Sequence, residues 1–75
     1  DEVMKKALRI VIDQRRVSNS ALRTKLAIGY NRAATIVEWM AKMKYVSASL
    51  DNKDRTVLIT REQYEELYGE FTEDF

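Results

Sequence analysis

The sequence predicts a mainly α-helical domain with a small β-hairpin, and two observations predict this class. Apolar residues recur at helical spacing as far as about residue 44, and from there to residue 59 the apolar period falls to about two. The length of 75 residues allows one compact domain. Because proline is absent and glycine occurs twice, we expect few long loops.

The first helix is expected over residues 2–16. Its apolar side chains, such as Leu8 and Val11, gather on one arc of the helix, and charged side chains such as Arg9 and Arg16 gather on the opposite arc. We therefore expect a helix that buries one stripe in the core and presents a basic face to solvent.

A helix-turn-helix is expected next. The second helix spans Asn19–Leu26, with Ser18 as the N-cap whose hydroxyl accepts from a free N–H of the first turn. Gly29 is expected to take the left-handed conformation that ends this helix. The third helix spans Tyr30 to about Lys44, and a short turn containing glycine between two helices is typical of a helix-turn-helix. Its buried face is expected to consist of Ala33, Ile36, Val37 and Met40.

Two strands joined by a polar turn are expected after the third helix. Residues 45–50 and 55–59 have the alternating and β-branched character of strands, and residues 51–54 have turn chemistry. The pair predicts a hairpin whose tip carries the basic residues Lys53 and Arg55.

A fourth helix is expected at Arg61–Tyr68, because Thr60 and Gln63 have the spacing of a capping box. We expect the last six residues to be frayed. Three helices with a helix-turn-helix, followed by a hairpin, form the winged-helix arrangement. The chain is thus expected to divide into a winged helix-turn-helix over residues 1–60, with a three-helix core plus wing, and an acidic C-terminal helix and tail over residues 61–75.

The formal net charge of +1 conceals an uneven distribution. Residues 1–60 carry twelve Lys and Arg against six Asp and Glu, whereas residues 61–75 carry one Arg against six acids. A basic body favours an anionic partner such as nucleic acid. A solvated surface with an acidic end that improves solubility is the alternative.

The composition excludes several classes of protein. Without cysteine or histidine the chain holds no disulfide, no Ser-His-Asp triad and no zinc site of the usual kind. The longest apolar run is three residues, too short to span a membrane, and the N-terminus has no secretory apolar region. We therefore expect a cytoplasmic binding module rather than an enzyme, with no cofactor, no metal, no small-molecule substrate and no membrane contact.

The outer stripe of the third helix favours binding to double-stranded DNA. A recognition helix meets the major groove with its N-terminal residues, where Asn pairs with adenine, Arg with guanine and Glu with cytosine. A solvated polar face, which every surface helix has, is the alternative. The residues expected to read bases are Asn31, Arg32, Thr35 and Glu38. Those expected to contact the DNA backbone are Arg23, Lys25, Tyr30, Lys42, Lys53 and Arg55.

Trp39 lies off the main core stripe of the third helix. We expect the C-terminal helix to cover it, because an exposed tryptophan is costly. The alternative is that Trp39 is a contact for a protein partner.

The segment Leu26–Met40 closely resembles the gamma domain of the FtsK/SpoIIIE bacterial DNA translocases, most specifically in the heptad Ile-Gly-Tyr-Asn-Arg-Ala-Ala at residues 28–34. Residues 44–47 and 52–58 are similar to the wing of that family. The resemblance covers about residues 2–59. It implies a winged helix at the C-terminal end of a hexameric, ATP-driven DNA motor, where it reads short G-rich polarity signals that orient the motor in chromosome segregation.

By position, the resemblance implies that Asn31, Arg32 and Glu38 lie at the DNA-reading end of the helix, and that Lys53 and Arg55 belong to the wing. It also implies the motor hexamer and a site-specific recombinase as partners. The expected location is the bacterial nucleoid, with a parent protein at the inner membrane.

The sequence departs from the family at Thr35, where the family usually has arginine, so the DNA target is open. Two alternatives to the translocase function also stay open. One is a free-standing winged-helix transcriptional regulator. The other is a protein-interaction winged helix that uses Trp39 and the acidic tail.

Overall fold

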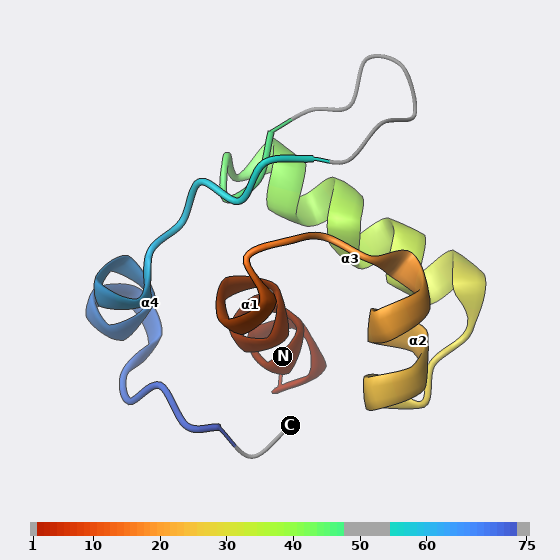
Figure 1. Ribbon diagram of the computed structural model, residues 1–75, viewed down its shortest axis with the longest axis horizontal. Helices are drawn as coiled ribbons and strands as arrows, with labels where there is room; N and C mark the ends of the chain where they lie inside the picture. Colours follow the sequence, from red (N-terminus) through yellow and green to blue (C-terminus); the bar gives the residue numbers. More distant parts are fainter. Residues whose placement is uncertain (1, 48–54, 74–75) are drawn as a thin grey trace.

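The structure is a computed structural model that describes residues 2–47 and 55–73. These residues form four helices, α1 (Glu2–Gln14), α2 (Asn19–Leu26), α3 (Tyr30–Lys42) and α4 (Arg61–Tyr68). Figure 1 shows α1 in the middle of the molecule, with α2 on one side and α4 on the other, and α3 running diagonally above α1 toward the α2 side. None of these helices is long and apolar enough to cross a lipid bilayer.

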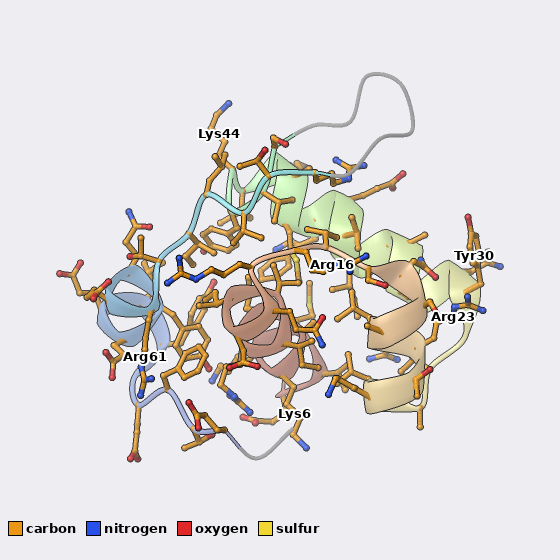
Figure 2. The ribbon with its side chains drawn as sticks, viewed as in Figure 1. Lys6, Arg16, Arg23, Tyr30, Lys44 and Arg61 are labelled. Atoms are coloured by element: carbon orange, nitrogen blue, oxygen red, sulfur yellow. The ribbon has the colours of Figure 1, made fainter. Side chains whose placement is uncertain are left out.

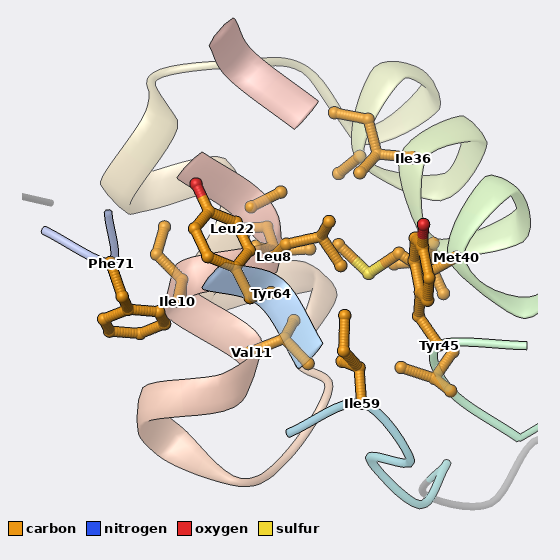
Figure 3. Packing of buried hydrophobic residues seen from close by; sticks show 14 residues of the cluster. Leu8, Ile10, Val11, Leu22, Ile36, Met40, Tyr45, Ile59, Tyr64 and Phe71 are labelled. Carbon is orange, nitrogen blue, oxygen red and sulfur yellow. The ribbon is translucent and has the colours of Figure 1, made fainter. Parts of the chain in front are cut away.

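The hydrophobic core is built around α1. Ala7, Leu8, Ile10 and Val11 are buried on α1, and Leu22 is buried on α2 (Figure 3). Full burial of a side chain as large as Leu8 or Leu22 contributes about 1.5–3 kcal/mol to folding. The buried face predicted for the third helix is confirmed, since all four of its residues are buried in this cluster.

The side-chain caps of α2 and α4 fix their first residues. The hydroxyl of Ser18 accepts a hydrogen bond of 3.1 Å from the N–H of Ala21. Thr60 accepts a bond of 3.1 Å from the N–H of Gln63, and the Gln63 side chain accepts one of 2.9 Å from the N–H of Thr60. Both predicted helix starts are therefore confirmed, because each cap satisfies an N–H that has no partner inside the helix.

The prediction that Gly29 ends α2 is wrong. Ala27 takes the left-handed conformation instead, with φ 54° and ψ 49°, and the N–H of Ile28 donates to the carbonyl of Arg23 at 3.2 Å. This bond closes the C-terminus of a helix only when the left-handed residue follows its last turn directly. Gly29 comes two residues later, has an extended backbone (φ −79°, ψ 170°) and is the N-cap of α3.

The predicted ends of α2 at Leu26 and α4 at Tyr68 are confirmed, whereas the first and third helices were predicted two residues too long. α1 ends at Gln14, because Arg15 is left-handed with φ 56°. α3 ends at Lys42, and Lys44 is left-handed with φ 64°. Non-glycine residues therefore provide the left-handed turns that follow α1, α2 and α3.

The predicted hairpin is described only at its base. Val46 and Val57 form an antiparallel bridge, and the N–H of Ser47 donates to the carbonyl of Thr56 at 2.9 Å. This bridge is the only strand pairing in the part of the chain that the structure describes. The predicted turn at residues 51–54, with Lys53, lies outside that part, so the complete wing stays a prediction.

The segment after Thr60 closes the core from the side opposite α2. Tyr64 of α4 is 1% exposed and Phe71 is 5% exposed, and their ring centroids lie 5.4 Å apart in an edge-to-face arrangement. The prediction that the last six residues are frayed is therefore wrong at Phe71, because an aromatic ring gains more by burial against the core than a frayed end gains in freedom.

Arg9 was expected on the solvent face of the first helix, and this expectation is also wrong. Its side chain is buried, and its Nη1 donates a hydrogen bond of 2.8 Å to the hydroxyl of Tyr64. The guanidinium also lies 6.0 Å from the centroid of the Tyr64 ring. α4 covers this side of α1, and the tyrosine supplies the acceptor that a buried charge requires.

Candidate nucleic-acid interface

α3 presents polar side chains on the side opposite the core, from its first turn as far as Glu38. Asn31, Arg32, Thr35 and Glu38 are all exposed, while the helix buries its apolar stripe against α1 and α2. The helical period places Asn31, Thr35 and Glu38 on one outward stripe with Arg32 on its flank. Since the N-terminus of a helix carries partial positive charge, this end of α3 attracts anions.

Thr35 already uses its hydroxyl proton within the helix. Its Oγ1 donates a hydrogen bond of 2.9 Å to the backbone carbonyl of Asn31. The side chain consequently offers a neighbouring molecule hydroxyl lone pairs and a methyl group, but no free donor.

A shallow cavity of about 360 Å³ runs beside this stripe. It is lined by Asn31, Arg32 and Thr35 together with the apolar side chains of Met4 and Ile36. The N-terminal end of α1 therefore forms one wall beside the polar face of α3.

α2 contributes basic side chains next to the start of α3. Arg23 and Lys25 are both exposed. The guanidinium carbon of Arg23 lies 5.5 Å from the ring centroid of Tyr30, which is 63% exposed. Figure 2 shows these two side chains together at the end of the molecule away from Arg61. A cation held over an aromatic face in this way loses part of its freedom before any ligand arrives.

Sequence reasoning missed the pairing of Arg23 with Tyr30. The two residues belong to different helices, and the turn between them breaks the helical period, so no spacing rule connects them. The signal that could have found the pair is the combination of an arginine and an exposed aromatic residue on either side of the helix-turn-helix turn.

The remaining predicted backbone contacts lie further along the chain. Lys42 is exposed in the last turn of α3. Arg55, at the base of the predicted wing, is half-buried and donates from Nη1 to the carbonyl of Ser47 at 3.1 Å. One bond uses only part of the five-donor guanidinium, so Arg55 both joins the two chain segments and retains donors for a ligand.

Trp39 is half-buried and packs edge-to-face on Tyr45, with ring centroids 5.6 Å apart. Tyr45 in turn meets Tyr68 of α4, and their hydroxyl oxygens lie 2.7 Å apart. Tyr45 therefore packs on Trp39, and Tyr68 of α4 packs on Tyr45. Direct cover of Trp39 by the C-terminal helix stays a prediction. Burial and the bond with Tyr45 raise the pKa of Tyr68 to about 12.

The family match and the most similar known proteins point to the same protein family. The chain matches the family described as the Ftsk gamma domain over residues 1–60. It is 39% identical over 62 residues to the DNA translocase FtsK of Clostridium acetobutylicum and 51% identical over 53 residues to the DNA translocase FtsK of Borreliella burgdorferi. It is 33% identical over 67 residues to the DNA translocase SpoIIIE of Bacillus subtilis.

These matches cover most of the chain but little of the relatives. The match to the Clostridium acetobutylicum protein covers 83% of the chain and 8% of that protein. The corresponding values are 71% and 7% for the Borreliella burgdorferi protein, and 89% and 8% for the Bacillus subtilis protein. The chain thus spans less than a tenth of the length of the curated relatives it matches. α4, at residues 61–68, lies beyond the segment that matches the family.

Proposed function

Because the chain belongs to the Ftsk gamma domain family, we propose that it binds double-stranded DNA through α2 and α3 and thereby orients a DNA translocase. Its relatives are named DNA translocases. In this proposal the chain is the part that reads DNA and carries no catalytic step of its own. The motor hexamer and a site-specific recombinase are its proposed protein partners.

The observation that supports the proposal most is the exposure of Asn31 and Arg32 together at the N-terminal end of α3, directly after the helix that carries Arg23 and Lys25. An amide pairs with the N6 and N7 of adenine through two hydrogen bonds, and a guanidinium pairs with the O6 and N7 of guanine. Glu38, about two turns further on, accepts from the N4 of cytosine. The three side chains together read a mixed sequence that includes guanine.

Thr35 has a more limited part in this reading. Because its hydroxyl proton is bonded to the carbonyl of Asn31, it contacts bases through its methyl group and its lone pairs. Such a side chain suits the methyl group of thymine or an amino group of adenine or cytosine. We therefore expect a target that differs at this position from one read by an arginine.

Arg23, Lys25 and Tyr30 hold the phosphate backbone in this proposal. Their contacts set the register of α3 in the major groove but carry no sequence information. Each phosphate that the domain neutralises releases counterions, so affinity falls as salt rises.

The test is fluorescence anisotropy with two labelled duplexes, one carrying tandem G-rich octamers and one with the same bases scrambled, over a series of salt concentrations. We expect tighter binding to the first duplex, with a salt dependence that corresponds to several neutralised phosphates. Equal, weak and salt-sensitive binding to both duplexes would retain DNA binding and reject polarity reading. No binding at low salt would reject the DNA function as a whole.

A variant with Asn31→Ala and Arg32→Ala tests the reading end of α3. Each bidentate base contact is worth about 1–3 kcal/mol, so the double substitution is expected to weaken specific binding at least about thirtyfold. Both side chains are exposed, so the fold remains intact. Lys6→Ala is the matched control, since it removes a cation from α1 away from α2 and α3 (Figure 2), and an equal loss there would contradict the assignment.

A further inference from the structure

A second cleft opens between the C-terminal end of α1, the segment 55–60 and the start of α4, and its volume is about 710 Å³. Four arginines line it: Arg15, Arg16, Arg55 and Arg61. Against them stands Glu62, the one carboxylate among the lining residues in the described part of the chain. The cleft is therefore strongly positive, and it is not accounted for by the DNA-reading face of α3.

The wall of the cleft between the arginines is largely apolar, with Thr56 and Thr60 as its polar members. Ile12, Val57, Leu58 and Ile59 line it, and the side chain of Leu58 is 51% exposed. An apolar side chain of a ligand can bury its surface against this half-exposed leucine, which lies inside a basic rim.

The cleft and the polar face of α3 lie at opposite ends of α1. Ile12, Arg15 and Arg16 belong to the C-terminal end of α1 or follow it directly, whereas Met4, near the N-terminal end, lines the cavity beside Asn31. Eight residues of helix separate Met4 from Ile12, a rise of about 12 Å. The cleft is therefore set apart from the base-reading side chains of α3, and among the lining residues that the structure describes Arg55 is the one predicted DNA contact.

Two of the four arginines are held in place by the protein itself. Arg55 donates to the carbonyl of Ser47 at 3.1 Å. Arg61 lies with its Nη1 3.7 Å from a carboxylate oxygen of Glu73 and with its guanidinium carbon 4.7 Å from the Phe71 ring centroid. Arg15 and Arg16 are both exposed at the rim, so they are the residues that offer charge to a ligand.

We infer that this cleft binds an acidic peptide segment of a protein partner, with a carboxylate on Arg15 and Arg16 and an apolar side chain on Leu58. Guanidinium groups bind carboxylates through paired, charge-assisted hydrogen bonds. The apolar wall favours a peptide over a phosphodiester backbone, because a backbone of phosphates and sugars has no large apolar group to bury there.

The test uses three fluorescein-labelled ten-residue peptides and the whole chain. One peptide alternates glutamate with leucine, one alternates glutamate with serine, and one alternates lysine with leucine. Anisotropy is expected to rise for the glutamate–leucine peptide, with affinity about tenfold weaker for the glutamate–serine peptide and no binding of the lysine–leucine peptide. Equal binding of all three, or no binding of the first, would overturn the inference.

The variant that removes the rim charge is Arg15→Gly with Arg16→Ala. Arg15 has φ 56°, a conformation that glycine adopts without strain, so the variant keeps its fold. We expect it to lose at least about tenfold in affinity for the glutamate–leucine peptide while its affinity for DNA changes little. The matched control is Arg23→Ala with Lys25→Ala, which also removes two cations and is expected to lose DNA affinity and keep peptide affinity.

Two results with these variants would overturn the inference. If the Arg15 and Arg16 variant binds the peptide as well as the unchanged chain does, the cleft is not the binding site. If it loses as much DNA affinity as the Arg23 and Lys25 variant, the cleft is part of a DNA-backbone surface. Neither result depends on polarity reading by α3, which the duplex comparison tests separately.

Discussion

Arg9 carries a charge into the interior of the domain, and the hydroxyl of Tyr64 is one of its partners. The bond measures 2.8 Å, and the two side chains are 5% and 1% exposed. If a buried guanidinium loses an acceptor, its desolvation penalty remains but the hydrogen bond that compensated for it is gone. The arginine and the tyrosine therefore act as one unit across α1 and α4.

Tyr64→Phe is predicted to lower the free energy of unfolding by about 2 kcal/mol, because it removes an acceptor from a buried charge and keeps the ring. Urea denaturation measures the change. Tyr30→Phe is the control, since the Tyr30 side chain is largely exposed and the loss of its hydroxyl is expected to change stability by less than about 0.5 kcal/mol. If the two variants lost the same free energy of unfolding, the hydrogen bond between Tyr64 and Arg9 would not contribute to stability as proposed.

Tyr68 gives the fold a dependence on alkaline pH. Burial and the bond with Tyr45 raise its pKa from 10.0 to about 12, so folding favours the protonated phenol. The stabilisation is complete below pH 10 and is lost as the pH rises through about 12.

The prediction is that Tyr68→Phe flattens the fall in unfolding free energy above pH 10, because phenylalanine has no proton to lose. Chemical denaturation at a series of pH values from neutral to alkaline measures the two slopes. Parallel slopes for the variant and the unchanged chain would mean that another group dominates the alkaline loss.

At the scale of elements, the sequence predicted best where the signal is local. Ser18 and Thr60 begin α2 and α4 where expected, because a cap acts over three residues and needs no tertiary information. The end of α2 at Leu26 was predicted correctly, but the left-handed residue after it was misplaced, because glycine is only the most favourable left-handed residue and Ala27 takes that conformation instead. The burial of Arg9 and Phe71 depends on α4 crossing α1, a long-range contact that no periodic pattern reports.

The same distinction holds for the candidate site. The exposure of Asn31, Thr35 and Glu38 on one side of α3 follows from the helical period. The contact of Arg23 with Tyr30 and the arginine-lined cleft do not, because each unites residues from different elements. Neither site could therefore be assembled from sequence spacing alone.

The turn between α2 and α3 stores strain at Ala27. The left-handed conformation costs alanine roughly 1–2 kcal/mol, and glycine avoids this cost. Glycine also has more conformational freedom in the unfolded chain, and this freedom offsets part of the gain. Ala27→Gly is therefore predicted to raise the free energy of unfolding by about 0.5–1 kcal/mol. Urea denaturation measures it.

Gly29→Ser provides the control for the turn. Gly29 has an extended backbone, and a Cβ there meets nothing within 4 Å. Serine in place of glycine at an N-cap is expected to change stability by only about 0.3 kcal/mol. If Ala27→Gly destabilised the chain as a glycine inside a helix does, the left-handed turn would be contradicted.

At the scale of the whole molecule, charge is separated along the longest dimension, which measures 33 Å. Glu62, Glu65 and Glu66 are exposed on α4, and Arg23 and Lys25 are exposed on α2. Figure 1 shows these two helices on opposite sides of α1. Such a distribution turns the basic side toward an approaching polyanion and repels it from the acidic side.

Replacement of Glu65 and Glu66 by glutamine is predicted to raise the rate of association with DNA at low salt and to leave the rate of dissociation almost unchanged. Long-range charge acts on the encounter, while contacts in the complex govern release. Stopped-flow anisotropy at two salt concentrations measures both rates. A change confined to the dissociation rate would place α4 in the interface itself.

The bond between Arg9 and Tyr64 joins residues 55 positions apart, and this separation has a consequence during synthesis on the ribosome. α1 leaves the exit tunnel well before Tyr64 and Phe71. The side of α1 that α4 covers in the folded domain therefore stays exposed to solvent until α4 has been translated. The domain then completes its core in a late step, because the long loop between these partners must close before their contact forms.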